Sequence, residues 1–170
     1  TGTFTAGSFN LEGSTTNATT GYTDHNVDDG DAAAPLTFQL PDVASSMSPG
    51  DVVYAPFWVR LDETTTNDAS LLAAGITPGT GGNEAHLSYT VTAIDPADTC
   101  DAAASGTSVA TGTTLSAQTG TAPVSLAKGA APATAGTAVQ LCFAVTAGTG
   151  LVEGAPATAT WKFTATSIDN

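Results

Sequence analysis

Several segments of the chain alternate strictly between apolar and polar residues with a period of two. In the segment 159–166, apolar side chains occupy the odd positions and Thr or Lys occupies the even positions. The same alternation recurs over 87–93, and further rows of alternate apolar residues run over 139–145 and 36–40. A strand with one apolar and one polar face is typical of an antiparallel sheet that is covered on one side.

Two such sheets hide their apolar faces by packing on each other. Helical signals are scarce: only the segment 68–75 favours a turn or two of helix, with Asp68 as its cap and Gly75 at its end. We therefore predict an all-β protein, an antiparallel β-sandwich of jelly-roll or Greek-key type, with at most one or two short helical turns. The 170 residues suit a single β-sandwich domain that spans 1–170.

The first predicted strand, over 3–11, departs from clean alternation. Phe4 lies in one phase, whereas Phe9 and Leu11 lie in the other. Gly7 stands between them, and a glycine inside a strand pattern indicates a bulge. Such a strand leaves backbone groups that a neighbouring chain can pair with.

The segment 52–61 also departs from the simple pattern. Its odd positions are typical of a core, but its even positions include Tyr54, Trp58 and Arg60, which are too aromatic for a plain solvated face. Pro56 cannot donate a hydrogen bond to a neighbouring strand, so this segment is predicted to be an edge strand or to be bulged. Two interpretations remain open, because either a loop of the same chain or another subunit could cover the stripe of Tyr54 and Trp58.

The charge balance excludes several functions. Only three Lys and Arg residues face 16 Asp and Glu residues, which gives a net charge of −13. Nucleic-acid binding needs clustered Lys and Arg, so we expect no nucleic-acid partner. No apolar run of about 18 residues occurs, so we expect no membrane insertion. The Thr-rich, Lys-poor composition and a start without Met favour a mature protein that is secreted to the cell surface or beyond.

The two cysteines, Cys100 and Cys142, predict a disulfide if the chain is secreted, and free thiols if it is cytosolic. We favour the disulfide, which would close a loop of about 40 residues and stabilise the fold by roughly 3–4 kcal/mol. Cys142 falls on the opposite face of its strand from Leu141 and Phe143. The bridge is therefore predicted to pin a connection outside the core.

Catalytic motifs are absent from the sequence: it has no His-Glu-x-x-His helix motif, no nucleophile elbow and no P-loop. We therefore predict that the protein is not an enzyme and requires no cofactor. The remaining acidic residues, which include Asp62, Asp68 and Asp95, lie where strands end and are predicted to be turn residues.

The densest polar cluster lies over residues 24–31. Its first residues match the first three ligand positions of a calcium loop, but Gly30 comes one position late and Pro35 stands where the bidentate Glu should be. Two interpretations stay open: a solvated acidic loop, or an irregular calcium site built from Asp24, Asn26, Asp28 and Asp31.

Four segments, in order along the chain, resemble the TasA/camelysin family of secreted bacterial proteins. Residues 3–11 (TFTAGSFNL) look like the family's opening TFxAGxLDL strand, and 36–40 followed by 47–51 (MSPGD) resembles its strand and LxPGD turn. Residues 67–71 (NDASL) lie where the family has an NxGSL-like stretch, and 159–167 resembles its closing FxFxATQ strand.

The resemblance implies a jelly-roll subunit of extracellular fibres in a biofilm matrix, which polymerises by donor-strand exchange. We expect a homopolymer of identical subunits, with acid or divalent cations favouring assembly because copies at −13 repel one another. Camelysin-like members are also described as metalloproteases, but no ligand set here supports that activity. The alternative is a monomeric secreted module that binds carbohydrate or a partner. The residues predicted to form the subunit contact are Thr3, Phe4, Thr5, Phe9, Leu11, Tyr54, Trp58 and Arg60.

Overall fold

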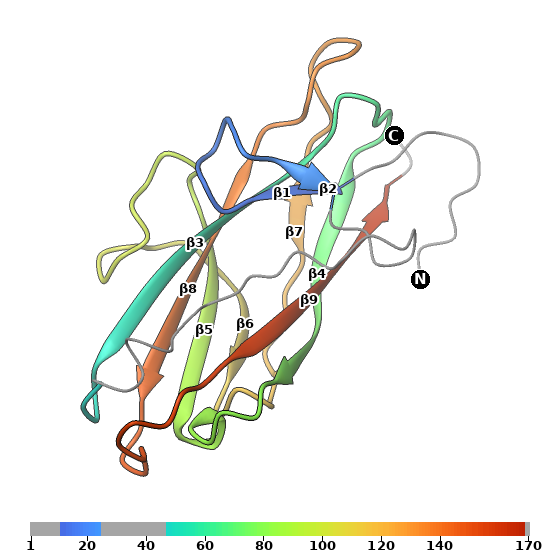
Figure 1. The fold of residues 1–170 in the computed structure, drawn as a ribbon. Helices are drawn as coiled ribbons and strands as arrows, with labels where there is room; N and C mark the ends of the chain where they lie inside the picture. Colours follow the sequence, from blue (N-terminus) through green and yellow to red (C-terminus); the bar gives the residue numbers. More distant parts are fainter. Residues whose placement is uncertain (1–10, 25–46, 169–170) are drawn as a thin grey trace.

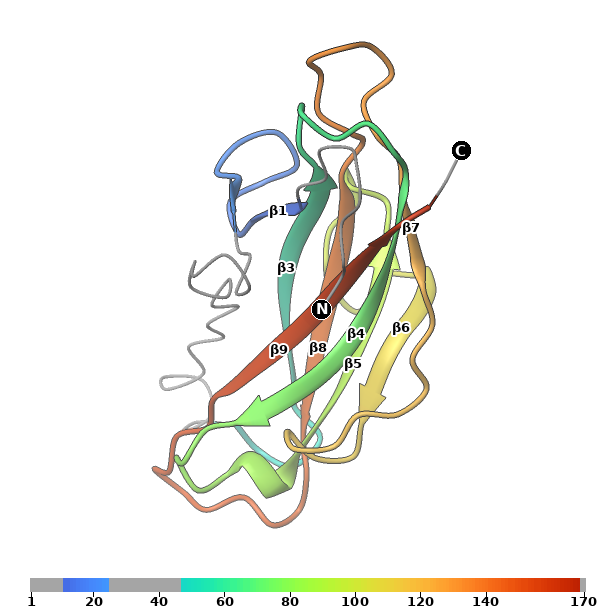
Figure 2. The same ribbon diagram turned by 90° about the vertical axis from the view of Figure 1, so that its right-hand side faces the viewer.

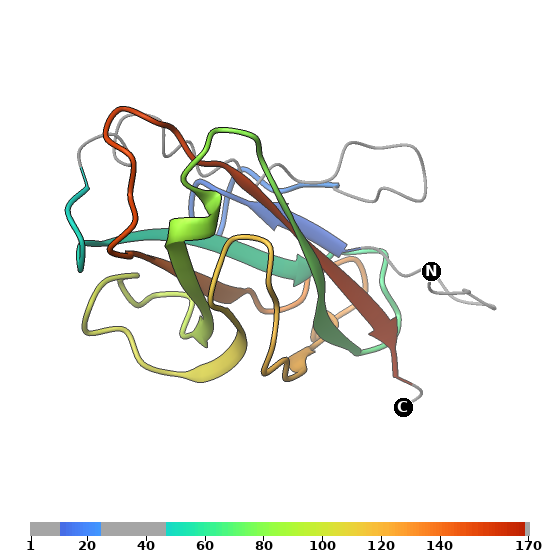
Figure 3. The ribbon, with the colours of Figure 1, turned by 90° about the horizontal axis from the view of Figure 1, so that it is seen from below.

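The computed structural model describes residues 11–24 and 47–168. This part of the chain consists of β-strands and one turn of 3-10 helix (Figure 1). The strands are β1 (Leu11–Ser14), β2 (Thr23–Asp24), β3 (Val52–Leu61), β4 (Ala69–Pro78), β5 (Leu87–Ile94), β6 (Thr107–Gly112), β7 (Val124–Leu126), β8 (Val139–Ala147) and β9 (Ala159–Ser167). The 3-10 turn, η2 (Glu84–His86), lies where the connection from β4 reaches β5 (Figure 3).

The strands form two antiparallel sheets. The larger sheet has the order β2-β1-β3-β8-β5-β6, and the smaller has the order β7-β4-β9. Figure 2 shows β9 and β4 lying across the strands of the larger sheet, so the two sheets form two layers. The predicted all-β sandwich class is therefore confirmed.

The core lies between these layers, and period-two alternation builds it. Tyr89 of β5 and Phe143 of β8 point inward and are 2% and 0% exposed. Trp161 of β9 meets both rings edge-on from the opposite sheet, with ring centroids 5.2 Å and 5.1 Å away. Edge-to-face contacts of this kind contribute about 0.5–1.5 kcal/mol each beyond the area they bury. The inward rows predicted over 87–93, 139–145 and 159–166 are confirmed.

The helical turn predicted over 68–75 is wrong, because this segment forms most of β4. Leu71 and Ala73 alternate inward and are buried, while Leu72 between them is 39% exposed. The carboxylate of Asp68 caps no helix; instead it accepts a hydrogen bond from the Lys128 backbone N–H at 2.9 Å. The adjacent apolar residues Leu71 and Leu72 are compatible with the apolar face of a helix, which is why a helical turn was predicted. In the structure the segment pairs with β9 and is extended.

The predicted strands over 3–10 and 36–40, and the bulge at Gly7, lie outside the described residues. Leu11 begins β1 and packs, half-buried, on the core. No helix in the described ranges is both long enough and apolar enough to cross a bilayer.

Candidate functional site

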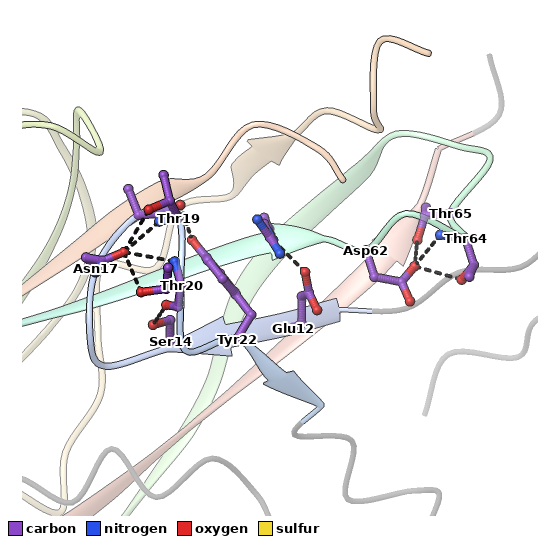
Figure 4. A network of polar contacts seen from close by, with 11 residues as sticks. Glu12, Ser14, Asn17, Thr19, Thr20, Tyr22, Asp62, Thr64 and Thr65 are labelled. Carbon is purple, nitrogen blue, oxygen red and sulfur yellow. Dashed lines mark hydrogen bonds and ion pairs between the residues drawn. The ribbon is translucent and has the colours of Figure 1, made fainter. Parts of the chain in front are cut away.

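The hairpin formed by residues 11–24 is held by its own polar side chains (Figure 4). The Asn17 Oδ1 atom accepts hydrogen bonds from the backbone N–H groups of Thr19 and Thr20, at 2.9 Å and 2.8 Å, and from both hydroxyl groups. The Ser14 hydroxyl donates to the Thr20 carbonyl at 2.6 Å. Short polar side chains that bond to nearby backbone specify a turn locally. The shape of this hairpin is therefore encoded within its own sequence.

The single arginine of the chain, Arg60 on β3, ties the hairpin to the larger sheet. Glu12 stands directly opposite Arg60 in the β1–β3 register, and the Arg60 Nε–H donates to the Glu12 carboxylate. The Arg60 guanidinium also lies 3.8 Å from the centre of the Tyr22 ring, a cation–π contact. Burial raises the pKa of the Tyr22 hydroxyl, while the positive charge of Arg60 acts in the opposite direction.

Gly13 allows the hairpin to approach the core closely. A Cβ atom built at Gly13 would lie 2.3 Å from the Cζ atom of Phe57, so no larger residue fits without displacing that ring. Gly13 pairs with Val59 in the same register that places Glu12 beside Arg60. β1 is therefore fixed at Leu11, the point where the N-terminal segment joins the described domain.

A pocket of about 360 Å³ opens beside the hairpin, and its walls are mostly polar. One guanidinium and the carboxylates of Glu12, Asp62 and Glu63 share this space. The Asp62 carboxylate accepts hydrogen bonds from the Thr64 N–H at 2.9 Å and the Thr64 hydroxyl at 2.7 Å, as expected for a turn residue. The lining residues are Glu12, Tyr22, Thr23, Arg60, Asp62, Glu63, Thr64 and Ala135.

The loop 95–106 covers part of the outer face of the larger sheet, and a disulfide holds it there. The bridge joins Cys100 of the loop to Cys142 of β8, with 5.3 Å between the Cα atoms. The Gln140 side chain, 1% exposed, donates its Nε2 hydrogens to the carbonyls of Asp95 and Asp98 at 3.1 Å and 2.8 Å. The predicted disulfide, outside the core, is confirmed.

The same loop covers one of the two aromatic residues of the β3 stripe. The Trp58 indole N–H donates to the Pro96 carbonyl at 3.0 Å, and Trp58 is only 9% exposed. Of the two interpretations left open by the sequence, the covering loop therefore applies to Trp58. Tyr54, four residues earlier, is half-buried on the outer face.

On one long side of the sandwich, the chain itself covers the sheet edge. Thr119 exchanges two backbone hydrogen bonds with Thr111 of β6, at 3.0 Å and 2.8 Å, and the Ala122 N–H donates to the Val109 carbonyl at 3.0 Å. The chain then enters β7 of the smaller sheet, which closes this side. Val109 and Leu115 are both fully buried there. We call this side the closed edge.

On the other long side, β9 and the first half of β3 each have one partner strand among the described residues (Figure 2). β9 pairs with β4 along its whole length, and the residues 52–56 of β3 pair with β8. Four apolar side chains on this side are only half-buried: Val53, Ala55, Phe163 and Ala165. We call this side the open edge.

The structure separates the predicted contact residues. Arg60 contacts the hairpin, Trp58 lies under the loop 95–106, and Tyr54 is half-buried on the outer face of β3. Leu11 begins β1. Thr3, Phe4, Thr5 and Phe9 lie outside the described residues.

Of the predicted calcium ligands, Asp24 ends β2. The other three, Asn26, Asp28 and Asp31, lie outside the described residues, so the calcium prediction remains open. Within the described ranges, no three His, Cys, Asp or Glu side chains are grouped so that they could hold a metal ion.

Sequence reasoning missed the partners of these residues. The Glu12–Arg60 pair joins residues 48 positions apart and is set by the register between β1 and β3, which alternation alone does not reveal. Gln140 was recognisable only as a polar residue beside an apolar row, and its buried position depends on the loop folding back over β8. Comparison of the chain with protein-family models, curated proteins and solved structures finds no match.

Proposed function

We propose that the chain is a structural subunit of a secreted, extracellular filament that polymerises head to tail. In this proposal, residues 1–10 of one copy add as a strand to the open edge of the next copy, because the predicted donor residue Leu11 is already paired with Leu61 in its own sheet. The jelly-roll connectivity and the resemblance to the TasA/camelysin family are part of the same proposal. The disulfide suits this location, because such bridges persist in oxidising, extracellular compartments.

The open edge is the observation that carries the proposal. β9 presents nine residues of backbone with a single described partner strand, and an unpaired edge is a template for strand addition. Phe163 and Ala165 of β9 remain half-buried beside it, so an added strand would complete their burial. A contact between the N-terminal segment of one copy and the open edge of the next is head to tail, and such a contact propagates as a filament where its rotation does not close into a ring.

The hairpin gives the added strand a defined starting point. Arg60 and Gly13 fix β1 on the larger sheet, so the N-terminal segment leaves from a rigid position at Leu11. A donor that starts from a fixed point loses less conformational freedom on docking than one that starts from a mobile end. The net charge of −13 opposes the approach of two copies, so we expect acid or divalent cations to increase assembly.

The exposure of the aromatic stripe does not favour the alternative of a carbohydrate-binding module. That reading needs both Tyr54 and Trp58 accessible for stacking on a sugar, but the loop 95–106 buries Trp58. Tyr54 is half-buried on the outer face.

The first test is negative-stain electron microscopy of the full chain at neutral and acidic pH, with light scattering in parallel. We expect uniform thin filaments, more abundant at acidic pH and with added divalent cations. The substitution Ala165→Arg places a large charged side chain at the open edge and should prevent assembly. Its matched control is Thr166→Arg, on the exposed outer face of the same strand, which should assemble normally.

A mixing experiment tests the head-to-tail geometry. A donor variant, Phe4→Lys with Phe9→Lys, keeps a normal open edge, whereas Ala165→Arg keeps a normal donor segment. Each variant alone should remain monomeric, and a mixture of the two should stop at heterodimers. Monodisperse wild-type monomers under every condition would overturn the proposal. A large loss of monomer stability in Ala165→Arg would then indicate that the edge is already covered within each monomer.

A further inference from the structure

The turn of the hairpin carries the motif Asn17-Ala18-Thr19, which the proposed function does not use. An asparagine followed two positions later by Ser or Thr, with any residue except Pro between them, is the acceptor pattern of N-linked glycosylation. Five asparagines of the sequence are followed by at least two residues, and only Asn17 has Ser or Thr at the second position. Short motifs also arise by chance in a Thr-rich chain, so the geometry of the turn must show whether Asn17 can be an acceptor.

Asn17 is exposed, and the turn uses only the oxygen of its side chain (Figure 4). The Oδ1 atom accepts hydrogen bonds from the hydroxyl groups of Thr19 and Thr20, both at 3.0 Å, and from the backbone N–H groups of the same two residues. A backbone N–H group can only donate, so these two bonds identify the contacting atom as the oxygen. Within the described part of the chain, the Nδ2 nitrogen of Asn17 donates no hydrogen bond.

The other contacts of the turn fix it on the larger sheet. The Tyr22 hydroxyl donates to the Ala18 carbonyl at 3.0 Å, and the Tyr22 ring faces the guanidinium of Arg60. A saccharide of this class is joined to Nδ2, and Oδ1 remains a carbonyl oxygen in the product. All four hydrogen bonds to Oδ1 are therefore compatible with a modified Asn17, and the turn presents the acceptor nitrogen without being rearranged.

We propose that Asn17 is a site of N-linked glycosylation, whose donor is a saccharide joined to a lipid through phosphate. In the transfer, a bond forms between Nδ2 and the anomeric carbon of the saccharide, and the bond from that carbon to the phosphate oxygen breaks. The lipid phosphate leaves with the electron pair of the broken bond, and a base of the transferase takes the proton from Nδ2. The four donors on Oδ1 stabilise the negative charge that the amide gains as this proton leaves.

The site rests on one part of the proposed function, the secreted location, because this motif is an acceptor in exported proteins. The disulfide between Cys100 and Cys142 is typical of the same compartments. The site does not depend on filament formation, so the two proposals can be tested apart.

Mass spectrometry of the full chain, isolated from its own source, tests the site. We expect an intact mass above that of the sequence, and peptide mapping should place the added saccharide on Asn17. Thr19→Val removes the motif, and Thr20→Val is the matched control, because it removes an equivalent hydroxyl bond to Oδ1 and keeps the motif. Expressed in the same source, Thr19→Val should lose the saccharide, whereas Thr20→Val and the conservative variant Thr19→Ser should keep it.

The outcomes separate this site from the filament. An Asn17 peptide without saccharide in the wild-type protein would overturn the site, whether or not filaments form. Loss of the saccharide from Thr20→Val to the same extent as from Thr19→Val would also overturn it, since the motif would then not be what the transferase recognises. Glycosylated wild-type protein that stays monomeric under every condition would overturn the head-to-tail proposal and leave this site standing.

Discussion

The two long sides of the sandwich differ in how far the chain itself covers the edges of the sheets. At the closed edge, a stretch of chain after β6 bonds to that strand and then enters the other sheet, so the side chains beneath it are fully buried. At the open edge, β9 and the start of β3 keep one described partner strand each, and their apolar side chains remain half-buried. An uncovered sheet edge presents unpaired backbone N–H and C=O groups, which can pair with another strand. The difference identifies the side on which a neighbour would find both backbone and apolar surface.

The largest expected effect on the free energy of unfolding comes from truncating one apolar side chain on each side to alanine. Leu115→Ala at the closed edge deletes a fully buried side chain and should lower the free energy of unfolding by about 2–5 kcal/mol. Phe163→Ala at the open edge removes a larger side chain that is only half-buried, and should cost about 1 kcal/mol in the monomer.

Urea unfolding of both variants, monitored by tryptophan fluorescence on unassembled protein, measures the two costs. Phe163→Ala should in addition reduce filament formation, whereas Leu115→Ala should assemble in proportion to its folded fraction. An equal cost for the two substitutions would mean that the open edge is already closed within each monomer.

The covering loop provides a third means of protecting a sheet, and its disulfide predicts the next effect. Replacing Cys100 and Cys142 with serine should lower the free energy of unfolding by roughly 3–4 kcal/mol, because the bridge closes a loop with a sequence separation of 42. Neither edge contains the bridge, so the difference between the edges should persist in the variant. Denaturant unfolding with and without a reductant provides the measurement. A reductant should lower the stability of the wild type to that of the variant, and should leave the variant unchanged.

Two acidic side chains anchor the two sides, Glu84 at the closed edge and Glu12 beside the open edge, and Glu84 should make the stability of the fold depend on pH. Glu84 is 8% exposed, and its carboxylate accepts hydrogen bonds from the N–H groups of Gly81 and Gly82, both at 2.7 Å. Its backbone carbonyl accepts the N–H of Leu115, which ties it to the closed edge. Burial by itself would raise the pKa of Glu84, but these N–H donors hold it below its ordinary value of 4.5.

A lowered pKa means that Glu84 stabilises the fold above pH 4.5, and that this stability is lost as the pH falls through its folded value. Glu84→Gln should therefore lower the free energy of unfolding by about 1–3 kcal/mol at neutral pH. The difference from the wild type should shrink in acid. Urea unfolding from neutral to strongly acidic pH checks this, and a difference that is constant with pH would contradict it.

The strand pattern was predictable because alternation is a local property. The inward rows of β5, β8 and β9 follow from which residues are apolar, and Cys142 could be placed outside the core by its phase against Leu141 alone. The prediction of a helical turn over 68–75 was wrong because two adjacent leucines are compatible with both the helical and the strand periodicity. Only the pairing with β9 selects the strand.

The candidate site depended on contacts that no local pattern carries. Whether a loop or a neighbour covers Trp58 depends on where the loop 95–106 folds, which is set by Gln140 and the disulfide together. The partner of Arg60 follows from strand register, and the closed edge follows from a crossing between sheets. Alternation predicts which residues face inward, but it does not predict which side of a sheet the chain returns to cover.

The smallest expected effect lies at the other acidic anchor, Glu12, beside the open edge. Its ion pair with Arg60 is partly exposed, with side chains 15% and 23% accessible, so it should contribute only about 0.2–1 kcal/mol. Glu12→Gln should cost that amount at low salt and nearly nothing at high salt, because screening weakens exposed pairs. The cost of Glu84→Gln, whose partners are backbone N–H groups, should hardly change with salt. Urea unfolding of both variants at two ionic strengths separates these cases. If the cost of Glu12→Gln is as large and as insensitive to salt as that of Glu84→Gln, the hairpin is anchored as firmly as the closed edge, and the two sides differ only in strand pairing.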